Sequence, residues 1–275
     1  MSGTLFVVGT PIGNLGDISP RALRVLEECD FIAAEDTRVT LKLLNHFEIK
    51  KSLISYFEHN RRQKGEYITE RILKGENCAL VSDAGMPAVS DPGEDLVALC
   101  HEKGIAVSVV PGPSAFVAAI ALSGLPVGRF TFEGFLSVSK VSRREHLSEV
   151  QKEKRTMVFY EAPHKLAATL KDMYEYFGNR NIAIVREITK IHEEVIRTTL
   201  KEASEKYSEE PLKGEIVLVI EGYKETEADL PTLEDAINLA RKYMDEGMSV
   251  SMASKQSAKE TGMKKGDIYK ALQEE

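Results

Sequence analysis

The sequence predicts an α/β protein built from two sheet-containing domains and a small helical module. In the first half, short apolar runs alternate with amphipathic stretches, which is the pattern of parallel strands joined by covering helices. After Gly124 the pattern changes, and two short strands around Ile182 and Val195 predict a hairpin and therefore a mixed sheet. Beyond an acidic stretch at 224–230, only helical patterns remain. We therefore expect α/β domains at residues 1–124 and 125–223 and a helical module at 232–275.

Five apolar runs in the first half are expected to be strands, at residues 5–8, 31–34, 53–56, 77–81 and 105–110. Helices are expected between them because apolar residues recur there at helical spacing. The first helix has Ser19 as its N-cap and Pro20 at its first position. The next is expected to end near His46, and two more are expected at 63–73 and 94–101.

The second half is expected to hold strands at residues 130–135, 156–160, 181–186, 193–198 and 215–221. Its expected helices are at 142–154, 165–177 and 200–207, and those of the tail are at 232–246, 250–261 and 267–273. The last two resemble a helix-turn-helix, because a glycine turn joins them. Residues 248–270 carry five lysines against two acids. Contact with RNA and a role in dimerisation or stability are equally open for this module.

The composition is that of a globular protein, since 43% of the 275 residues are hydrophobic and 29% are charged. No apolar run approaches the roughly 18 residues of a membrane span, and Met1–Thr4 does not begin a leader peptide. We therefore expect no membrane contact and a cytoplasmic location. Cys29, Cys78 and Cys100 lack CxxC spacing and are expected in the core. No metal-ligand spacing occurs among the histidines, so no metal site is predicted.

The formal charge of -7 argues against a protein that grips nucleic acid with its whole surface, because phosphate binding requires cations. Basic clusters at 61–64, 143–144 and 152–155 leave open a local contact with nucleic acid. Each cluster taken alone is more often a solvated helix face.

The loop at 83–93 is the first candidate for a binding site. It follows an apolar strand, begins with Asp83, and contains Gly85 and two prolines that restrict the backbone. In open α/β sheets, ligands gather at the carboxyl ends of strands, and other polar or kinked loops also follow strands in this chain. The alternative is an ordinary connection in which Asp83 serves as a turn or cap residue.

Three familiar site patterns are not met. The spacing at Gly9–Gly16 is GxxxGxxG rather than GxGxxG, and Pro11 removes a backbone N–H where a pyrophosphate needs donors. Ser114 does not lie in a GxSxG elbow, and no HExxH sequence occurs. A nicotinamide-dependent enzyme, a serine hydrolase and a zinc peptidase are therefore disfavoured.

Seven motifs in this order resemble the tetrapyrrole-methylase-like (class III) S-adenosylmethionine methyltransferases, and within them the branch that methylates a cytidine ribose of bacterial small-subunit rRNA. They are Gly9–Leu15, Ala34–Arg38, Ser82–Pro87, Pro111–Ala115, Glu133–Phe135, Glu161–His164 and Arg186–Lys190. The resemblance covers roughly residues 4–222 and the tail. Many tetrapyrrole methylases have Gly-Asp-Pro where this chain has Ser82-Asp83-Ala84, which lowers the expectation of a porphyrin-like substrate.

The resemblance implies two α/β domains with S-adenosylmethionine in the cleft between them, and a homodimer. The residues that it assigns to cofactor binding are Gly9, Pro11, Asp83, Gly85, Met86, Val89, Ser114, Ala115, Tyr160, Glu161, Ala162, Gly214 and Glu215. Ser114 opens a helix whose free N–H groups suit a carboxylate, and glycine permits close approach of the backbone.

Methyl transfer to a ribose hydroxyl needs a group that accepts the hydroxyl proton. We expect Asp36 or Glu187 to take this role, with Arg38, Arg186 and Lys190 as anchors for phosphate and ribose. The alternative is that these residues form salt bridges between the domains.

The substrate that the resemblance implies is the 2′-OH of a decoding-region cytidine in 16S rRNA. The net charge of -7 favours the assembled 30S subunit over naked RNA as its form. Two alternatives remain open. A methyltransferase of the same fold for a small tetrapyrrole would not need the basic tail, and a non-catalytic ribosome-assembly or RNA-binding factor would have no affinity for S-adenosylmethionine.

Overall fold

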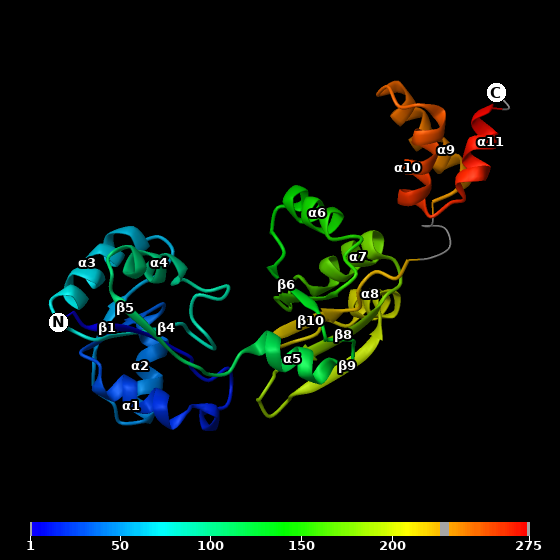
Figure 1. Cartoon of the computed structure of the whole chain (residues 1–275). Helices are drawn as coiled ribbons and strands as arrows, with labels where there is room; N and C mark the ends of the chain where they lie inside the picture. The colour runs from blue at the N-terminus through cyan, green and yellow to red at the C-terminus, as the bar shows by residue number, and fades with distance from the viewer. Residues whose placement is uncertain (1, 226–230, 274–275) are drawn as a thin grey trace. The chain divides into compact units, whose positions relative to one another are not determined.

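The computed structural model describes residues 2–225 and 231–273 (Figure 1). The chain divides into two compact units, Met1–Gly222 and Tyr223–Glu275. The first unit contains two five-stranded sheets and the second contains three helices, which confirms the predicted fold class. None of the described helices is both long and apolar enough to cross a bilayer.

The first sheet is entirely parallel and has the strand order β3-β2-β4-β1-β5. Its strands are β1 (Thr4–Val8), β2 (Phe31–Ala34), β3 (Ser52–Ser55), β4 (Cys78–Val81) and β5 (Ala106–Val110). The helices α1 (Pro20–Glu28) and α2 (Thr37–His46) pack into one core cluster, whereas α3 (Arg61–Leu73) and α4 (Glu94–Glu102) pack into another. Because helices cover both faces, β2 and β4 are buried along their whole length, as their uninterrupted apolar runs predict.

The second sheet is mixed, with the order β6-β7-β10-β8-β9. Its strands are β6 (Phe130–Phe135), β7 (Thr156–Glu161), β8 (Asn181–Arg186), β9 (Glu194–Thr199) and β10 (Ile216–Ile220). Only β6 and β7 are parallel, and the predicted hairpin is the antiparallel pair β8 and β9. The helices α6 (Lys140–Glu149), α7 (Leu166–Phe177) and α8 (Leu200–Glu209) pack around one core of this sheet.

Helix α5 (Ala115–Ser123) packs on the second sheet, although it precedes the boundary expected at 124–125. Its sequence is apolar on all sides, which is typical of a helix covered by protein. Ala119 and Ile120 contact the β7, β8 and β10 residues of a shared core. The chain therefore reaches the second sheet before β6 begins, and the exact domain boundary stays a prediction.

Helix α6 is shorter than the expected 142–154, because it begins after Ser139 and ends at Glu149. Val150 closes the helix by donating its N–H to the His146 carbonyl at 3.1 Å. The carbonyl of Gln151 accepts a hydrogen bond from the Arg180 guanidinium, so the following residues turn back toward β7. The charged stretch at 152–155 has helical composition but lies outside the helix.

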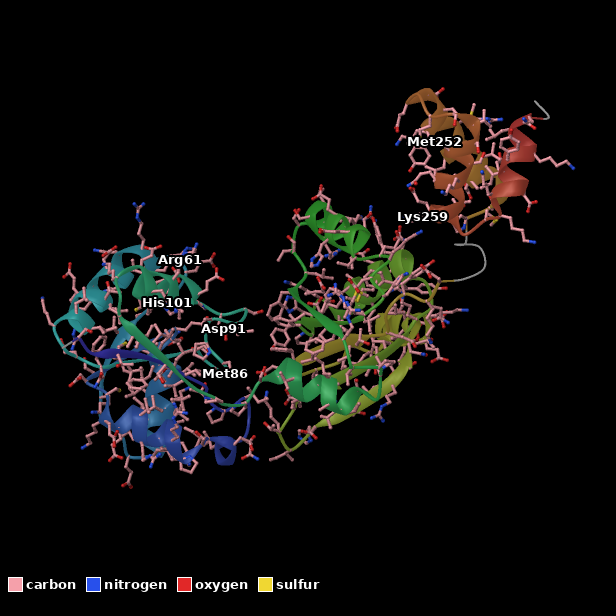
Figure 2. All side chains as sticks on the ribbon, in the orientation of Figure 1. Arg61, Met86, Asp91, His101, Met252 and Lys259 are labelled. Atoms are coloured by element: carbon pink, nitrogen blue, oxygen red, sulfur yellow. The ribbon has the colours of Figure 1, made fainter. Side chains whose placement is uncertain are left out.

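The second unit has helices α9 (Leu233–Asp245), α10 (Val250–Thr261) and α11 (Lys265–Gln273). Thr232 and Asp235 form a reciprocal capping box at its start. A small core of Ala236, Ala240, Ala253 and Ile268 holds the helices together. Figure 2 labels Met252 and Lys259 on this module. Most of the acidic stretch expected as a linker, residues 226–230, lies outside the described residues.

Candidate active site

Three loops at the carboxyl ends of β1, β4 and β5 are joined into one wall. Thr10 donates its N–H to the Gly85 carbonyl at 2.9 Å, and Gly85 donates to the Thr10 carbonyl at 3.1 Å. The N–H of Gly112 points at the Met86 sulfur, 3.3 Å away. A Cβ at Gly9 would lie 2.7 Å from the Cα of Gly112, so the loops after β1 and β5 approach more closely than a side chain permits.

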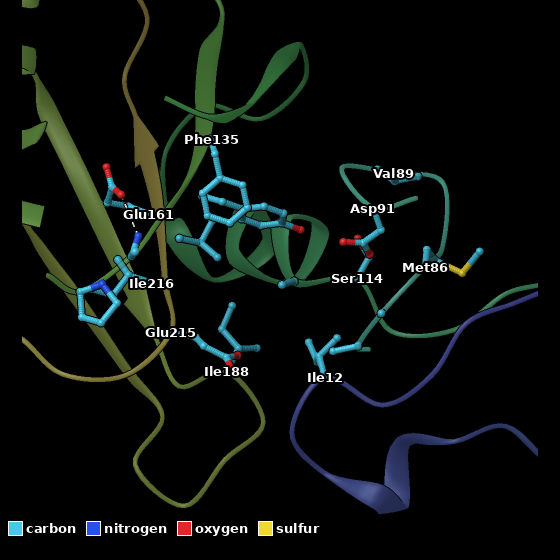
Figure 3. Close-up of a pocket in the computed structure, with 17 residues that line it drawn as sticks. Ile12, Met86, Val89, Asp91, Ser114, Phe135, Glu161, Ile188, Glu215 and Ile216 are labelled. Atoms are coloured by element: carbon cyan, nitrogen blue, oxygen red, sulfur yellow. Dashed lines mark hydrogen bonds between the residues drawn. The ribbon is translucent and has the colours of Figure 1, made fainter. Parts of the chain in front are cut away.

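This wall borders a cavity of about 380 Å³, within the size range of small-molecule sites (Figure 3). The lining residues from the first sheet's loops and the start of α5 are Ile12, Ala84, Gly85, Met86, Val89, Asp91, Ser114 and Ala115. Those from the second sheet and its loops are Phe135, Tyr160, Glu161, Ala162, Pro163, Ile188, Glu215, Ile216 and Val217. Figure 3 shows Asp91 and Ser114 across the cavity from Ile188, Glu215 and Ile216.

Most of the residues expected at a cofactor site line this cavity: Gly85, Met86, Val89, Ser114, Ala115, Tyr160, Glu161, Ala162 and Glu215. Gly9, Pro11, Asp83 and Gly214 do not. Gly9 lies behind Met86, whose sulfur would be 2.6 Å from a Cβ there. Gly214 has φ of +96°, and a Cβ there would lie 2.6 Å from the Glu187 side chain. Cofactor contact by these four residues stays a prediction.

Several lining residues were not among those expected, notably Asp91 and Phe135. Asp91 lies in the loop at 83–93, which the sequence had already marked as a binding-site candidate, so its place in this loop was the signal that could have identified it. Phe135 is positioned by a register shift in β6 between Phe132 and Gly134, where Gly134 has φ of +64°. Such a bulge re-aims the side chains that follow it, and nothing in the apolar run indicates where it falls.

Every charged residue lining the cavity is acidic, and the three carboxylates have different surroundings. Glu161 is buried and accepts hydrogen bonds from the Ala162 N–H and the Thr169 hydroxyl. Glu215 is largely exposed, and its carboxylate lies 3.2 Å from the Lys190 ammonium. Asp91 is partly buried, and this burial raises its pKa although a hydrogen bond from Ser82 opposes the shift. The cavity therefore presents negative charge to a ligand.

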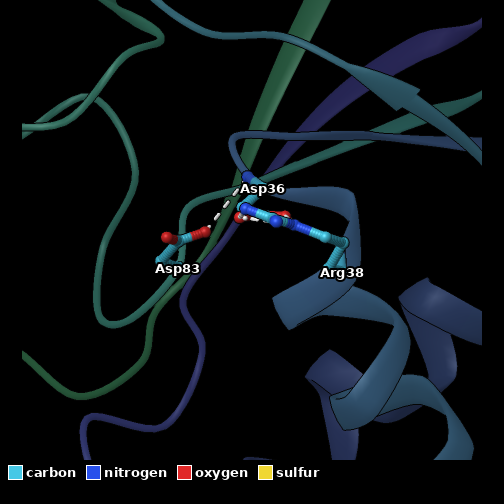
Figure 4. A network of polar contacts seen from close by, with 3 residues as sticks. All are labelled: Asp36, Arg38 and Asp83. Carbon is cyan, nitrogen blue, oxygen red and sulfur yellow. Dashed lines mark hydrogen bonds and ion pairs between the residues drawn. The ribbon is translucent and has the colours of Figure 1, made fainter.

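Asp36 is fixed as the N-cap of α2 (Figure 4). Its carboxylate accepts the Arg38 N–H at 2.8 Å and forms an ion pair with the Arg38 guanidinium at 2.6 Å. The hydrogen bonds from Arg38 lower the Asp36 pKa to about 2. The Asp36 N–H donates to Asp83 at 3.1 Å, so the Asp83 carboxylate is engaged at this strand end. Burial raises the Asp83 pKa, although the hydrogen bond from the Asp36 N–H opposes this shift.

Glu187 and Lys190 form a second polar cluster beside the cavity. Glu187 accepts the Glu215 N–H at 2.9 Å and the Lys190 ammonium at 3.1 Å, and the backbone bond from Glu215 chiefly lowers its pKa. Arg186 pairs with Glu194 at 3.0 Å. Glu187 and Thr189 both adopt positive φ, at 51° and 65°, a strain that is common at functional sites.

The five residues expected to act in catalysis, Asp36, Arg38, Arg186, Glu187 and Lys190, lie outside the cavity lining. Their neighbours Ile188 and Glu215 do line it. The ion pairs described above for these residues join partners within the same α/β half and do not connect the two halves. Their catalytic roles stay predictions.

Comparison with known proteins identifies the class. The model of the family described as Tetrapyrrole (Corrin/Porphyrin) Methylases matches residues 4–204. The chain belongs to this family, which confirms the resemblance seen in its motifs. A relative from Halalkalibacterium halodurans, called Ribosomal RNA small subunit methyltransferase I, is 46% identical over 276 residues, which cover 99% of this chain and 96% of the relative.

A protein of the same name from Thermotoga maritima is 48% identical over 220 residues, covering 80% of this chain but 99% of that protein. Among solved structures, a cobalt precorrin-4 methyltransferase has a TM-score of 0.60 and 17% identity, covering 79% of this chain and 94% of that one. Uroporphyrin-III C-methyltransferase from Thermus thermophilus, complexed with S-adenosylhomocysteine, has a TM-score of 0.54 and 16% identity over 80% of this chain and 97% of that one. These structures share the fold.

Proposed function

We propose that this chain transfers a methyl group from S-adenosylmethionine to the ribose 2′-OH of a decoding-region cytidine in 16S rRNA. The observation that carries the proposal is its 46% identity, over 99% of its length, to a protein named as a small-subunit rRNA methyltransferase. Family membership supports methyl transfer, and that name supports small-subunit rRNA as the substrate.

The cavity residues fit the proposed methyl donor. S-adenosylmethionine supplies an electrophilic methyl group on a sulfonium, and it also carries an ammonium and a carboxylate. Acidic lining residues suit its cations, and the absence of lysine or arginine among the lining residues disfavours a phosphate ligand. Ser114 caps the nine-residue helix α5, whose first N–H groups suit the donor's carboxylate. We assign Met86, Val89 and Tyr160 to its apolar parts.

Asp36 and Glu187 are the proposed acceptors of the ribose proton. The lowered pKa of each carboxyl keeps it ionised at neutral pH but also makes it a weaker base. Because both carboxylates are candidates, the turnover of an Asp36 variant has to be compared with that of a Glu187 variant. Arg38, Arg186 and Lys190 are proposed to position RNA phosphate and ribose, because transfer requires the hydroxyl to be aligned with the donor.

Assembled 30S subunits are the proposed substrate, and the active form is proposed to be a homodimer in the cytoplasm. The net charge of -7 supports recognition of a shaped particle over naked RNA, because a long RNA requires many cationic contacts. The lysines of the C-terminal module, among them Lys255, Lys259 and Lys265, are the proposed auxiliary RNA contact.

The test uses S-adenosylmethionine labelled in its methyl group, incubated with the full chain and unmodified small subunits. Label in 16S rRNA supports the proposal, and naked 16S rRNA should accept less label than assembled 30S. Label in an added uroporphyrinogen but not in rRNA would support the tetrapyrrole alternative. The absence of binding to S-adenosylmethionine in calorimetry would support a non-catalytic assembly factor.

A further inference from the structure

Asp91 is the cavity carboxylate whose charge is balanced neither by a cation, as in Glu215, nor by two hydrogen-bond donors, as in Glu161. Glu161 is satisfied by two donors, and Glu215 lies beside Lys190, whereas Asp91 forms no ion pair within residues 2–225 and 231–273. A partly buried carboxylate without a counter-charge is unfavourable, and Asp83 adds like charge nearby. A cationic ligand would relieve this cost.

The backbone holds Asp91 in place at some energetic expense. Ala88 and Ser90, two non-glycine residues just before it, adopt positive φ of 63° and 65°. Such conformations are strained for residues with a side chain, and they persist where the surroundings enforce them. The paired Thr10 and Gly85 anchor the start of the same loop to the wall. Figure 2 shows Asp91 and Met86 on this loop.

Two aromatic side chains of the second sheet line the same cavity as Asp91. Phe135 and Tyr160 line the same cavity, with ring centroids 5.3 Å apart. The charge of Asp91 contributes to the raised pKa of Tyr160, after burial, so the two sides of the cavity lie within electrostatic reach. Aromatic faces attract cations, and they suit bulky, weakly hydrated cations carrying methyl groups.

We propose that Asp91, together with the rings of Phe135 and Tyr160, forms a cation site that recognises the sulfonium charge of the methyl donor. This inference rests on the proposed function. S-adenosylmethionine and S-adenosylhomocysteine share the nucleoside, ammonium and carboxylate, and they differ by one methyl group and one positive charge at sulfur. The site would therefore favour the donor over its demethylated product.

The role of Asp91 is one of affinity and specificity. The sulfonium charge is present in the bound donor and fades as the methyl group leaves, so a carboxylate that stabilises it acts mainly on the ground state. Such an interaction tightens binding without accelerating the chemical step. Removing the Asp91 charge should raise the KM for the donor without lowering kcat.

The test measures the dissociation constants of S-adenosylmethionine and S-adenosylhomocysteine by calorimetry for the full chain and for Asp91→Asn. We expect the variant to bind S-adenosylmethionine about tenfold more weakly, as a lost charge contact of this kind implies, and S-adenosylhomocysteine within about twofold of the original protein. Phe135→Leu should shift the same ratio in the same direction by a smaller factor.

Two controls separate charge recognition from loop damage. Glu94→Gln removes one negative charge from an exposed position just after the loop, and should leave both dissociation constants unchanged. Ser82→Ala removes a hydroxyl that lowers the Asp91 pKa and donates to the Ala84 carbonyl, but it keeps the Asp91 carboxylate and should retain the preference for the donor. Loss of the preference in Ser82→Ala as well would attribute the effect to loop geometry and overturn the proposal.

Other outcomes also contradict the assignment. Equal weakening of both ligands by Asp91→Asn would mean that Asp91 contacts a group they share, such as the ammonium. A large fall in kcat with unchanged affinity would make Asp91 a proton acceptor instead. If the unsubstituted chain binds neither ligand, the proposed function itself fails. If it binds both ligands and Asp91→Asn changes neither dissociation constant, only the Asp91 assignment fails.

Discussion

At the scale of single residues, Gly112 shows how closely the loops of the cavity wall approach one another. A Cβ there would lie 2.8 Å from the backbone of Gly9. We predict that Gly112→Ala destabilises the protein by about 1–3 kcal/mol, as overpacking does, and weakens donor binding because the wall is displaced. Urea unfolding and calorimetry measure the two effects. Gly128→Ala is the matched control, since a Cβ there meets nothing within 4 Å.

Asp36 and Glu187 are tested by separate substitution. We predict that alanine at the position of the true proton acceptor lowers kcat about a hundredfold or more, while S-adenosylmethionine affinity stays the same. Alanine at the other position should act more weakly, through the lost N-cap of α2 or the lost contact with Lys190. Unchanged turnover in both variants would remove these residues from the chemistry.

The three cysteines are buried, and burial raises the pKa of Cys29 and of Cys100 to about 11. The thiolate is the reactive form, so below this pKa the native thiols are protonated as well as shielded. We predict that a thiol reagent such as DTNB at pH 8 labels the native chain slowly and modifies all three cysteines after unfolding in urea. Rapid labelling of the native chain would contradict this packing.

Among the elements, α5 links the wall of the cavity to the second sheet. Arg197 of β9 donates to the carbonyls of Ser123 and Leu122, at 2.9 and 2.7 Å, and so satisfies the end of this helix. We predict that Arg197→Ala costs about 1–2 kcal/mol of stability because charged donors at helix carbonyls are lost. Thermal unfolding measures this, and Arg24→Ala on the exposed face of α1 should differ little from the original protein.

Strands were easier to predict than helix ends or cavity residues. The apolar runs ending at Ala34 and Val81 are buried on both faces, and their shortness and apolar composition mark them as strands. The end of α6 is closed by the Val150 N–H, and no Gly, Asn or Pro follows it to mark this end in the sequence. A bulge in β6 directs Phe135 to the cavity, and the pairing of β10 with its neighbours places Ile216 there. Nothing in the sequence around either residue indicates that it lines a cavity. The motif loops, in contrast, could be located because their glycines and prolines are visible in sequence.

For the whole molecule, the separate C-terminal unit makes a prediction about substrate delivery. We predict that a chain ending at Gly222 folds and binds S-adenosylmethionine with unchanged affinity, because the first unit has its own cores. Its methylation of 30S subunits should be weaker and more salt-sensitive. Full activity without the module would exclude it from RNA contact.

Methyl transfer to a cytidine ribose of 16S rRNA is tested by mass-spectrometric mapping. Unmodified 30S subunits are incubated with the full chain and methyl-labelled S-adenosylmethionine, and the labelled positions in 16S rRNA are identified. We predict one labelled methyl group, on the ribose of a cytidine in the decoding region. Reactions that contain S-adenosylhomocysteine in excess should show less label. Label on a base, label spread over many nucleotides, or unlabelled rRNA with a chain that binds the donor would contradict this prediction.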